Sequence, residues 1–502
     1  MTQLTLDPPV DNGRTVEPQR SGTKIPWVTL APPLSGAARA PYFVTEDGEA
    51  WTPIGQNDAI SWPELNGLFR RRDVASAERY LDTLAARGVT TLRLMLEYAQ
   101  LNARMFERPA GKFRPGMVQL WDDLFAMCEQ RGLRILLTPY DTFWMWNRWS
   151  HHPYNQRNGG PCKSRSSMLL CPETRKFIKD RLAFATDRWG GSGALFAWDL
   201  WNEIHPSYAG NSAECFGDFI ADLSEYVRDL ETRLYGRDHP QTVSMFGPHL
   251  VLDPRIPDAI FRHPRLDFAS THFYEEGTID FPRNTVDAAL SVARLIRESL
   301  TQTPPDRPFF DSESGPIHTF KDHHKTLPEP FDDEYFRHMQ WAHFAAGGAG
   351  GGMRWPNRHP HSLTPGMRRA QAALARFLPL IDWRRFRRKN LNHEVRVSHP
   401  AVRVAACGDD RQALMWLIRT GSHGNDGMMR RDLQPVQTAV EVPGLAAGEY
   451  RITGWDTSAG ESVGSQTCSH SGVGAFRFDT PPFVADLALA VSGVGAAVNV
   501  RN

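Results

Sequence analysis

The chain has 502 residues, enough for one large domain and a smaller second one with a sizeable hydrophobic core. It carries 57 Lys and Arg against 57 Asp and Glu, so its formal net charge is zero, which argues against a nucleic acid or an anionic membrane as partner. We therefore expect a neutral ligand, and we expect some of the 15 Trp side chains to form a binding surface.

The first 24 residues, "MTQLTLDPPVDNGRTVEPQRSGTK", lack the basic and apolar regions of a classical export signal, and no run approaches 18 apolar residues. These features predict a cytoplasmic protein without a membrane span. The six Cys residues lack the spacing of a zinc site or a disulfide framework, so we expect reduced thiols and no metal or cofactor. A metal or disulfide near His151, His152, Cys162 and Cys171 is the alternative to a simple polar loop.

Residues 1–41 are rich in Pro, Gly and Ser and are expected to form an irregular lead-in. From Tyr42 a hairpin is predicted, with Asp47 and Gly48 in its turn. Strand and helix patterns then alternate, with a helix expected to begin at Asp73 and end at Gly88.

Eight apolar runs separated by amphipathic helical segments indicate a parallel sheet. The runs are 52–57, 89–96, 133–141, 194–203, 242–248, 266–274, 307–315 and 351–358. Eight such units predict an α/β fold, a (β/α)8 TIM barrel over residues 42–388. An open doubly wound sheet is the alternative.

Short alternating segments such as "ALMWLIRT" and "EYRITGWDT" follow, and they predict a small C-terminal β-sandwich domain over residues 389–502. This domain is either a stabilising appendage or a carbohydrate-binding module. The basic run from Arg384 to Lys389 suggests either a site for a polyanion or a solvated hinge with an interdomain surface.

Polar or aromatic side chains end almost every predicted strand, where a (β/α)8 barrel carries its catalytic groups. They are Asn57, Arg93, Glu97, Tyr140, Asp141, Asn202, Glu203, His272, Tyr274, Glu313, Arg354 and Trp355. Glu203 alone could be a helix-start carboxylate or a salt-bridge partner. Two carboxylates, Glu203 and Glu313, on opposite walls of one pocket suit cleavage of a glycosidic bond, whereas metal-dependent hydrolysis needs clustered His and Asp.

The chain resembles the clan A retaining glycoside hydrolases, and most closely glycoside hydrolase family 5. The resemblance covers about residues 42–385 and rests on "GQN", "LRL", "WNE", "HFY" and "ESG" at successive strand ends. It implies that Glu203 is the acid/base, Glu313 the nucleophile and Asn202 a partner for the sugar 2-hydroxyl. It further implies that Arg93 and Tyr274 hold Glu313 ionised, that His272 lines the cleft, and that Trp355 forms the floor of the −1 subsite.

Two departures from the family pattern concern substrate recognition. Family 5 members commonly carry a His after the third strand, where this chain has "PYDTFWMW", so Asp141 or an aromatic side chain is expected to take over that sugar contact. The acid/base is followed by Ile204 instead of the usual Pro. The loop that carries Trp144 and Trp146 is expected to form either subsite walls or a small core of its own.

These observations predict a retaining glycosidase that acts on a β-type bond of a neutral oligosaccharide or glycoside and is exo-acting or releases a disaccharide. The alternatives are a transglycosidase and a catalytically silent carbohydrate-binding barrel. We expect Arg93 to keep the pKa of Glu313 low and the nearby negative charge to raise the pKa of Glu203, so that the two titrate apart. The sequence leaves the oligomeric state open.

Overall fold

The computed structural model describes residues 25–33, 39–70, 73–99, 105–275, 277–319, 321–322 and 324–494. Most of the predicted lead-in, residues 1–24 and 34–38, lies outside the described residues, as does the predicted end of the C-terminal domain at 495–502. Within the lead-in, the chain forms a strand where we expected irregular structure. This strand, β1 (Val28–Leu30), pairs with β2 (Phe43–Thr45), which in turn pairs with β3 (Ala50–Trp51) through the predicted turn.

The next strands are parallel and follow chain order, with two strands at the fifth predicted position and one at each of the other six among the first seven. The strands are β4 (Gly55–Asp58), β5 (Thr91–Met95), β6 (Arg134–Thr138), β7 (Leu195–Asp199), β8 (Gln241–Thr242), β9 (Ser244–Phe246), β10 (Ser270–Glu275) and β11 (Glu313–Pro316). Pairing runs from β4 to β8 and from β9 to β11. At the eighth predicted position, Arg354 makes single parallel bridges to Gln56 and Ser314, and so it lies between β4 and β11.

Helices cover the sheet, and every residue of β5, β6 and β7 is buried, as expected of a parallel sheet that is packed on both faces. The long helices are α2 (Val74–Ala86), α3 (Pro115–Gln130), α5 (Pro172–Trp189), α6 (Phe216–Tyr235), α9 (Asp287–Gln302), α10 (Glu329–Ala345) and α11 (Pro365–Phe377). Shorter ones are α1 (Asn66–Arg70), α4 (Thr142–Arg148), α7 (His249–Leu252) and α8 (Arg255–Phe261). Among the described residues, none of these helices has the length and apolarity needed to cross a bilayer.

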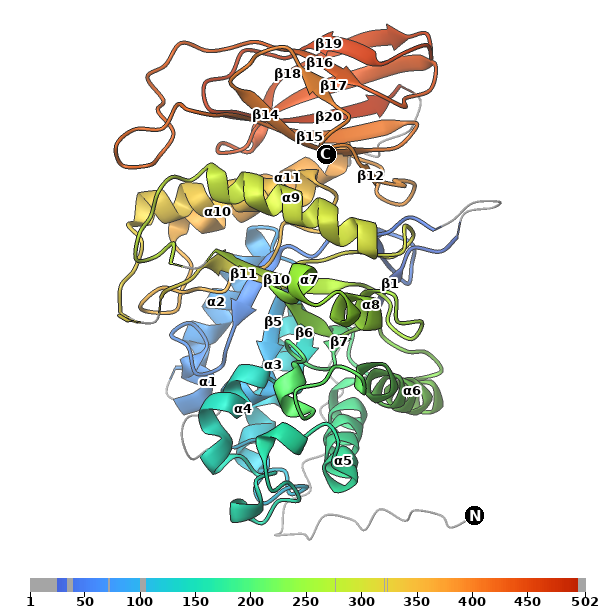
Figure 1. Ribbon diagram of the computed structural model, residues 1–502, viewed down its shortest axis with the longest axis vertical. Coiled ribbons are helices and arrows are strands. Elements are labelled where there is room, and N and C mark those ends of the chain that lie inside the picture. The colour runs from blue at the N-terminus through green and yellow to red at the C-terminus, as the bar shows by residue number, and fades with distance from the viewer. Residues whose placement is uncertain are drawn as a thin grey trace.

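The C-terminal part is antiparallel and β-rich, and it lies over α9, α10 and α11 (Figure 1). Its strands are β12 (Lys389–Asn390), β13 (Arg396–Val397), β14 (Val402–Gly408), β15 (Gln412–Arg419), β16 (Ala439–Val442), β17 (Gly448–Asp456), β18 (Glu461–His470), β19 (Phe476–Asp479) and β20 (Asp486–Gly493). They form a sheet ordered β12-β14-β15-β20-β17-β18 and a second sheet ordered β13-β16-β19. Both sheets contribute to one apolar core, for example Met415 and Leu489 from the first and Val440 and Phe478 from the second.

A buried ion pair joins this C-terminal part to the helices beneath it. Arg337 of α10 donates to Asp486 of β20 at 2.7 Å, and the side chains are 6% and 1% exposed. Trp416 Nε1 donates to the same carboxylate at 3.0 Å. Burial alone raises the pKa of Asp486, but the facing Arg337 guanidinium holds it well below its usual range, so this carboxylate stays charged inside the junction.

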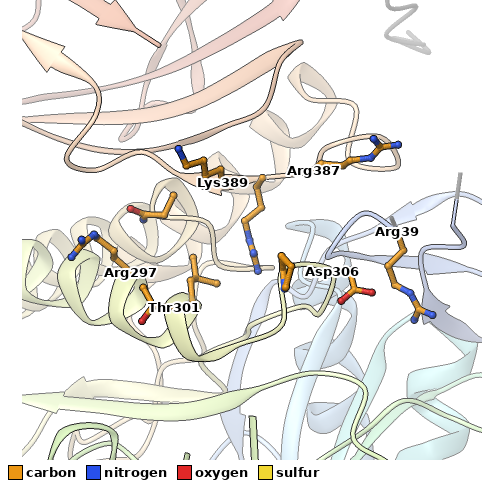
Figure 2. A pocket seen from close by; sticks show the side chains of 10 residues that line it. Arg39, Arg297, Thr301, Asp306, Arg387 and Lys389 are labelled. Carbon is orange, nitrogen blue, oxygen red and sulfur yellow. The ribbon is translucent and has the colours of Figure 1, made fainter. Parts of the chain in front are cut away.

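The basic run packs along this junction. Arg388 is buried and donates to the carbonyl oxygen of Gly347 at 2.6 Å, while Lys389 pairs with Glu394 at 2.9 Å. A cavity of about 500 Å³ beside the run is lined by the basic side chains of Arg39, Arg297, Arg387, Arg388 and Lys389. The labelled cationic ends do not converge on one point (Figure 2). This geometry favours a hinge and interdomain surface over a polyanion site.

Replacing Arg337 with Ala should lower the free energy of unfolding by about 3–5 kcal/mol, because Asp486 is left as a buried charge without its partner. Urea denaturation followed by circular dichroism measures the loss. Arg294→Ala is the matched control, since Arg294 forms an exposed pair with Glu298 on α9, and it should change stability little. Equal effects of the two substitutions would show that the junction does not depend on the Arg337–Asp486 pair.

Candidate active site

Arg93 of β5 lies at the centre of the predicted site and is buried. Its Nη1 donates to Glu313 Oε2 at 2.7 Å and to Asn57 Oδ1 at 2.9 Å. Its Nη2 donates to Asp199 Oδ2 at 2.7 Å and to Asn202 Oδ1. Burial alone lowers the pKa of Arg93, but the two carboxylates raise it above its usual value, so the guanidinium stays charged.

Glu313 begins β11 and is held by two donors. Tyr274 OH donates to Oε1 at 2.5 Å, and Arg93 binds Oε2. Burial raises the pKa of Glu313 above its ordinary value, while Arg93 and Tyr274 act in the opposite direction. The low pKa that we expected from Arg93 alone is therefore wrong in direction, because that expectation left out the loss of hydration in a closed pocket.

The main chain at Glu203 is held in an uncommon conformation, with a φ of 48°. A left-handed conformation costs a non-glycine residue about 1–3 kcal/mol and persists only where the surroundings enforce it. Here Glu203 N donates to Ser244 Oγ at 3.1 Å, and its carbonyl oxygen accepts from Thr142 Oγ1 at 2.8 Å. The side chains of Ser244 and Thr142 thus fix the main-chain position from which the Glu203 side chain extends.

The two oxygens of the Glu203 carboxyl group have different surroundings. Oε1 is hydrogen bonded to His272 Nδ1 at 2.6 Å, whereas Oε2 is buried without a hydrogen-bond partner among the described residues. Burial, and then the charges of Glu313 and Asp141, raise the pKa of Glu203 well above its usual value. Burial likewise holds the pKa of His272 far below its usual value, so the surroundings favour the protonated form of Glu203 beside an uncharged imidazole.

Glu203, His272 and Glu313 each place one oxygen or ring nitrogen within 4.8 Å of the others. Two carboxylates and an imidazole at this spacing could hold a metal ion. However, Arg93 already supplies a positive charge at 2.7 Å from Glu313, and the raised pKa of Glu203 favours its neutral form. The arrangement therefore suits a pair of carboxyl groups in different protonation states.

Asn202 and Asp141 form the next layer of the site. Asn202 accepts from Arg93 and donates through Nδ2 to Asp141 Oδ1. Asp141 also caps α4, accepting from the main-chain nitrogen of Trp144 at 2.6 Å. Burial raises the pKa of Asp141 to about 7. The structure thus brings Asp141 to the site with its oxygens bound by protein donors, and its predicted contact with sugar stays a prediction.

The predicted aromatic residues are distributed over two environments. Trp355 follows the Arg354 bridge, and its ring lies 5.0 Å from that of Trp62 in an edge-to-face contact. In the loop after β6, Trp144 is 9% exposed, whereas Trp146 is 51% exposed with the Arg165 guanidinium 3.8 Å from its ring centre. Trp144 is thus packed inside the loop and Trp146 lies on its surface, and the contact of these side chains with sugar stays a prediction.

The alternative of a metal or disulfide in the same loop has no support from the contacts there. Cys162 Sγ donates to the carbonyl oxygen of Ser164 at 2.8 Å, and all six Cys side chains are free thiols. His152 Nε2 is bound to Glu97 Oε1 at 3.0 Å, and Arg181 donates to the same oxygen at 2.8 Å. Glu97 thus ties the loop to the body of the fold instead of facing Glu313.

Three further residues belong to the site but were not predicted from the sequence, namely Asp199, Ser244 and Ser312. Asp199 balances Arg93, Ser244 holds the main chain of Glu203, and Ser312 Oγ is bound to His272 Nε2 at 3.0 Å. The signal for Asp199 was present, since it is a lone carboxylate inside the apolar run "ALFAWDLW". The two serines have no comparable signal.

Neither family models nor curated proteins give a match to this chain. Among solved structures, one titled as a glycoside hydrolase is similar over 92% of this chain and 96% of its own, with a TM-score of 0.55 and 13% identity. A glycoside hydrolase family 5 structure from Bacteroides vulgatus has a TM-score of 0.54 at 13% identity, covering 91% of this chain and 92% of its own. A putative glycoside hydrolase from the same organism has a TM-score of 0.54 at 11% identity, covering 93% and 82%. At such identities, the comparisons establish the fold that the chain shares with these proteins.

The charge on Glu313 should control the protonation of Glu203. Replacing Glu313 with Gln removes one of the negative charges that raise the pKa of Glu203, so this pKa should fall. Carbon-13 NMR of labelled glutamate side chains measures the titration without any need for activity. Glu225→Gln is the control, because Glu225 forms a half-exposed pair with Arg265. It should leave the pKa of Glu203 unchanged. An unchanged titration in Glu313→Gln would show that the charge of Glu313 does not set the pKa of Glu203.

Proposed function

We propose that the chain is a clan A retaining glycosidase, most like glycoside hydrolase family 5, which hydrolyses a β-type bond of a neutral oligosaccharide or glycoside. One observation carries the proposal. Glu203, whose Oε2 has no hydrogen-bond partner among the described residues, and Glu313, which is held by Arg93 and Tyr274, have oxygens within 4.8 Å of each other. Retaining glycosidases place their carboxyl groups about 5–5.5 Å apart, while inverting ones leave about 6.5–9.5 Å for a water.

We further propose that the parallel strands close into a (β/α)8 barrel over residues 42–388. The bridges of Arg354 to Gln56 and Ser314 support closure, because they join the first strand of the series to the last. For residues 389–502 we propose a β-sandwich that stabilises the barrel. The buried Arg337–Asp486 pair supports this role, since it fixes the C-terminal part to α10.

In the first step, Glu313 attacks the anomeric carbon and the bond to the leaving oxygen breaks. Glu203 gives its proton to that oxygen as the bond breaks, so the leaving group departs as a neutral alcohol. A glycosyl ester on Glu313 and an ionised Glu203 remain. We propose that Asn202, which is held between Arg93 and Asp141, binds the sugar 2-hydroxyl. Trp355 is proposed to form the floor of the −1 subsite.

In the second step, the roles of Glu203 reverse. The ester carries no negative charge, so one of the charges that raised the pKa of Glu203 is gone, and Glu203 can act as a base. It takes a proton from water, the resulting hydroxide attacks the anomeric carbon, and Glu313 leaves as a carboxylate. Two inversions at one carbon retain its configuration. Neutral His272 stays bound to Oε1 and leaves Oε2 for both proton transfers.

For the substrate, we propose exo action or release of a disaccharide, with Trp144 and Trp146 as candidate walls beyond the −1 subsite. The half-exposed ring of Trp146 supports a contact of this kind, because aromatic faces stack on the apolar faces of sugar rings. Analysis of products from a short oligosaccharide separates these modes. It also separates hydrolysis from transglycosylation, which yields products longer than the substrate.

Glu203→Gln should lose about 10²- to 10⁴-fold in rate on glycosides with poor leaving groups, because these need a proton as the bond breaks. Dinitrophenyl glycosides, whose leaving group needs no proton, should lose far less. Initial rates on both substrate types measure the difference. Glu275→Gln is the matched control, because Glu275 is an exposed carboxylate at the end of β10. It should leave the rates on both substrate types unchanged. Equal loss on both substrates would remove Glu203 from the acid role.

A 2-deoxy-2-fluoro glycoside with an activated leaving group should label Glu313, because the fluorine slows both steps while the activated leaving group keeps the first step fast enough for the glycosyl ester to accumulate. Peptide mass mapping identifies the labelled residue. Proton NMR of the first-formed product from an ordinary substrate should show the anomeric configuration of that substrate. A label on Glu97 or Glu275, or an inverted first product, would contradict the proposed mechanism.

A further inference from the structure

We infer that the leaving-group side of the site is an apolar shelf that receives an alkyl or aryl aglycone instead of a second sugar. This inference rests on the proposed function, since it concerns the group that Glu203 protonates. We define the aglycone shelf by its residues, which are Phe143, His205, Phe246, His249, Val251 and Leu252.

The shelf is built next to Glu203 by the contacts that hold the Glu203 main chain. Thr142 and Ser244 hydrogen bond to this main chain, and they are followed by Phe143 one residue later and by Phe246 two residues later. His205 lies two residues beyond Glu203 itself. Three neighbouring strand ends thus each extend an aromatic residue past the proposed acid.

The four rings form a continuous series of contacts. The ring centres of Phe143 and Phe246 lie 6.3 Å apart, and those of Phe246 and His249 lie 5.5 Å apart. His249 and His205 complete the series at 5.0 Å. Edge-to-face and tilted contacts at these distances are favourable aromatic geometries, so the rings form one surface.

The shelf is apolar and open to solvent. Phe143 is 44% exposed, and Val251 and Leu252, which follow His249 on α7, are 66% and 78% exposed. Burial lowers the pKa of His249 to about 4 and lowers that of His205, so both rings are uncharged at neutral pH. The nearby Asp253 carboxylate is paired with Arg255 at 2.9 Å.

The position and chemistry of the shelf indicate its occupant. The leaving oxygen must lie at Glu203 Oε2 to receive the proton, so the rest of the leaving group extends over residues that flank Glu203. A second sugar would bring several hydroxyl groups, whereas the exposed side chains of the shelf, Phe143, Val251 and Leu252, carry no polar atom to bind them. When an alkyl chain or aryl ring binds instead, apolar surface of both the shelf and the leaving group is removed from water. Each buried methylene then raises the affinity about fourfold.

The test compares alkyl glycosides of one sugar, which a panel of nitrophenyl glycosides first identifies. Methyl and hexyl glycosides have leaving groups of similar basicity, so the ratio of their kcat/KM values reports contact with the aglycone. We expect the hexyl glycoside to exceed the methyl glycoside by about tenfold or more, as burial of two or three methylenes requires. Leu252→Ser and Phe143→Ala should remove most of this advantage and leave kcat/KM for the methyl glycoside unchanged.

Val473→Ser is the matched control, because Val473 is 83% exposed in the C-terminal β-rich part. It should leave kcat/KM for both glycosides unchanged. Hydrolysis of both glycosides at equal kcat/KM, or equal loss on both in the shelf variants, would overturn the inference and leave the proposed function standing. If the wild-type protein hydrolyses none of the panel, the proposed function is wrong and the inference falls with it.

Discussion

A single buried guanidinium sets the charge balance on which the site depends. Arg93 binds both Asp199 and Glu313 at 2.7 Å, so one positive charge is shared by two negative ones inside a volume closed to water. A third carboxylate in the same volume would add a second uncompensated negative charge, which a medium of low polarity strongly disfavours. Burial raises the pKa of both glutamates, but Arg93 opposes the rise through a direct hydrogen bond to Glu313, whereas the charges of Glu313 and Asp141 add to the rise at Glu203.

The same side chain also connects distant parts of the chain. Through its hydrogen bonds, Arg93 of β5 contacts Asn57 of β4, Asp199 of β7 and Glu313 of β11. Such a set of buried hydrogen bonds is costly to break, because each partner would be left unpaired away from water. Arg93 thus fixes the spacing of the strand ends from which the site is built, and a strained residue such as Glu203 can persist on this frame.

Local pattern was sufficient to predict much of the fold. The apolar runs and amphipathic segments placed the parallel strands and the long helices, and the Asp73 cap and the turn at Gly48 lie where the sequence indicated. The strand in the lead-in was missed because Val28–Leu30 pairs only with a strand 13 residues or more away. A three-residue strand carries no period of its own.

The candidate site was predictable in its members and less so in its electrostatics. Polar residues at the ends of apolar strands stand out in sequence, so Glu203, Glu313, Arg93, Asn202, His272 and Tyr274 were found, and the structure brings them together. The direction of the Glu313 pKa was not predictable, because burial depends on every element that closes the pocket. The same holds for Trp144 and Trp146, which differ only in how the loop folds around them.

The proposed acid stands between two contrasting surfaces, and this asymmetry suits a two-step reaction. On one side lie Arg93, Glu313 and Asn202, and on the other lies the uncharged aglycone shelf. Glu203 itself is already buried, so in the proposed reaction an apolar leaving group would cover the exposed shelf beside it without changing the burial that raises its pKa. The departure of the leaving group as a neutral alcohol opens the shelf to solvent and admits the water that the second step needs. The shelf would thereby select the leaving group and also time the change of Glu203 from acid to base.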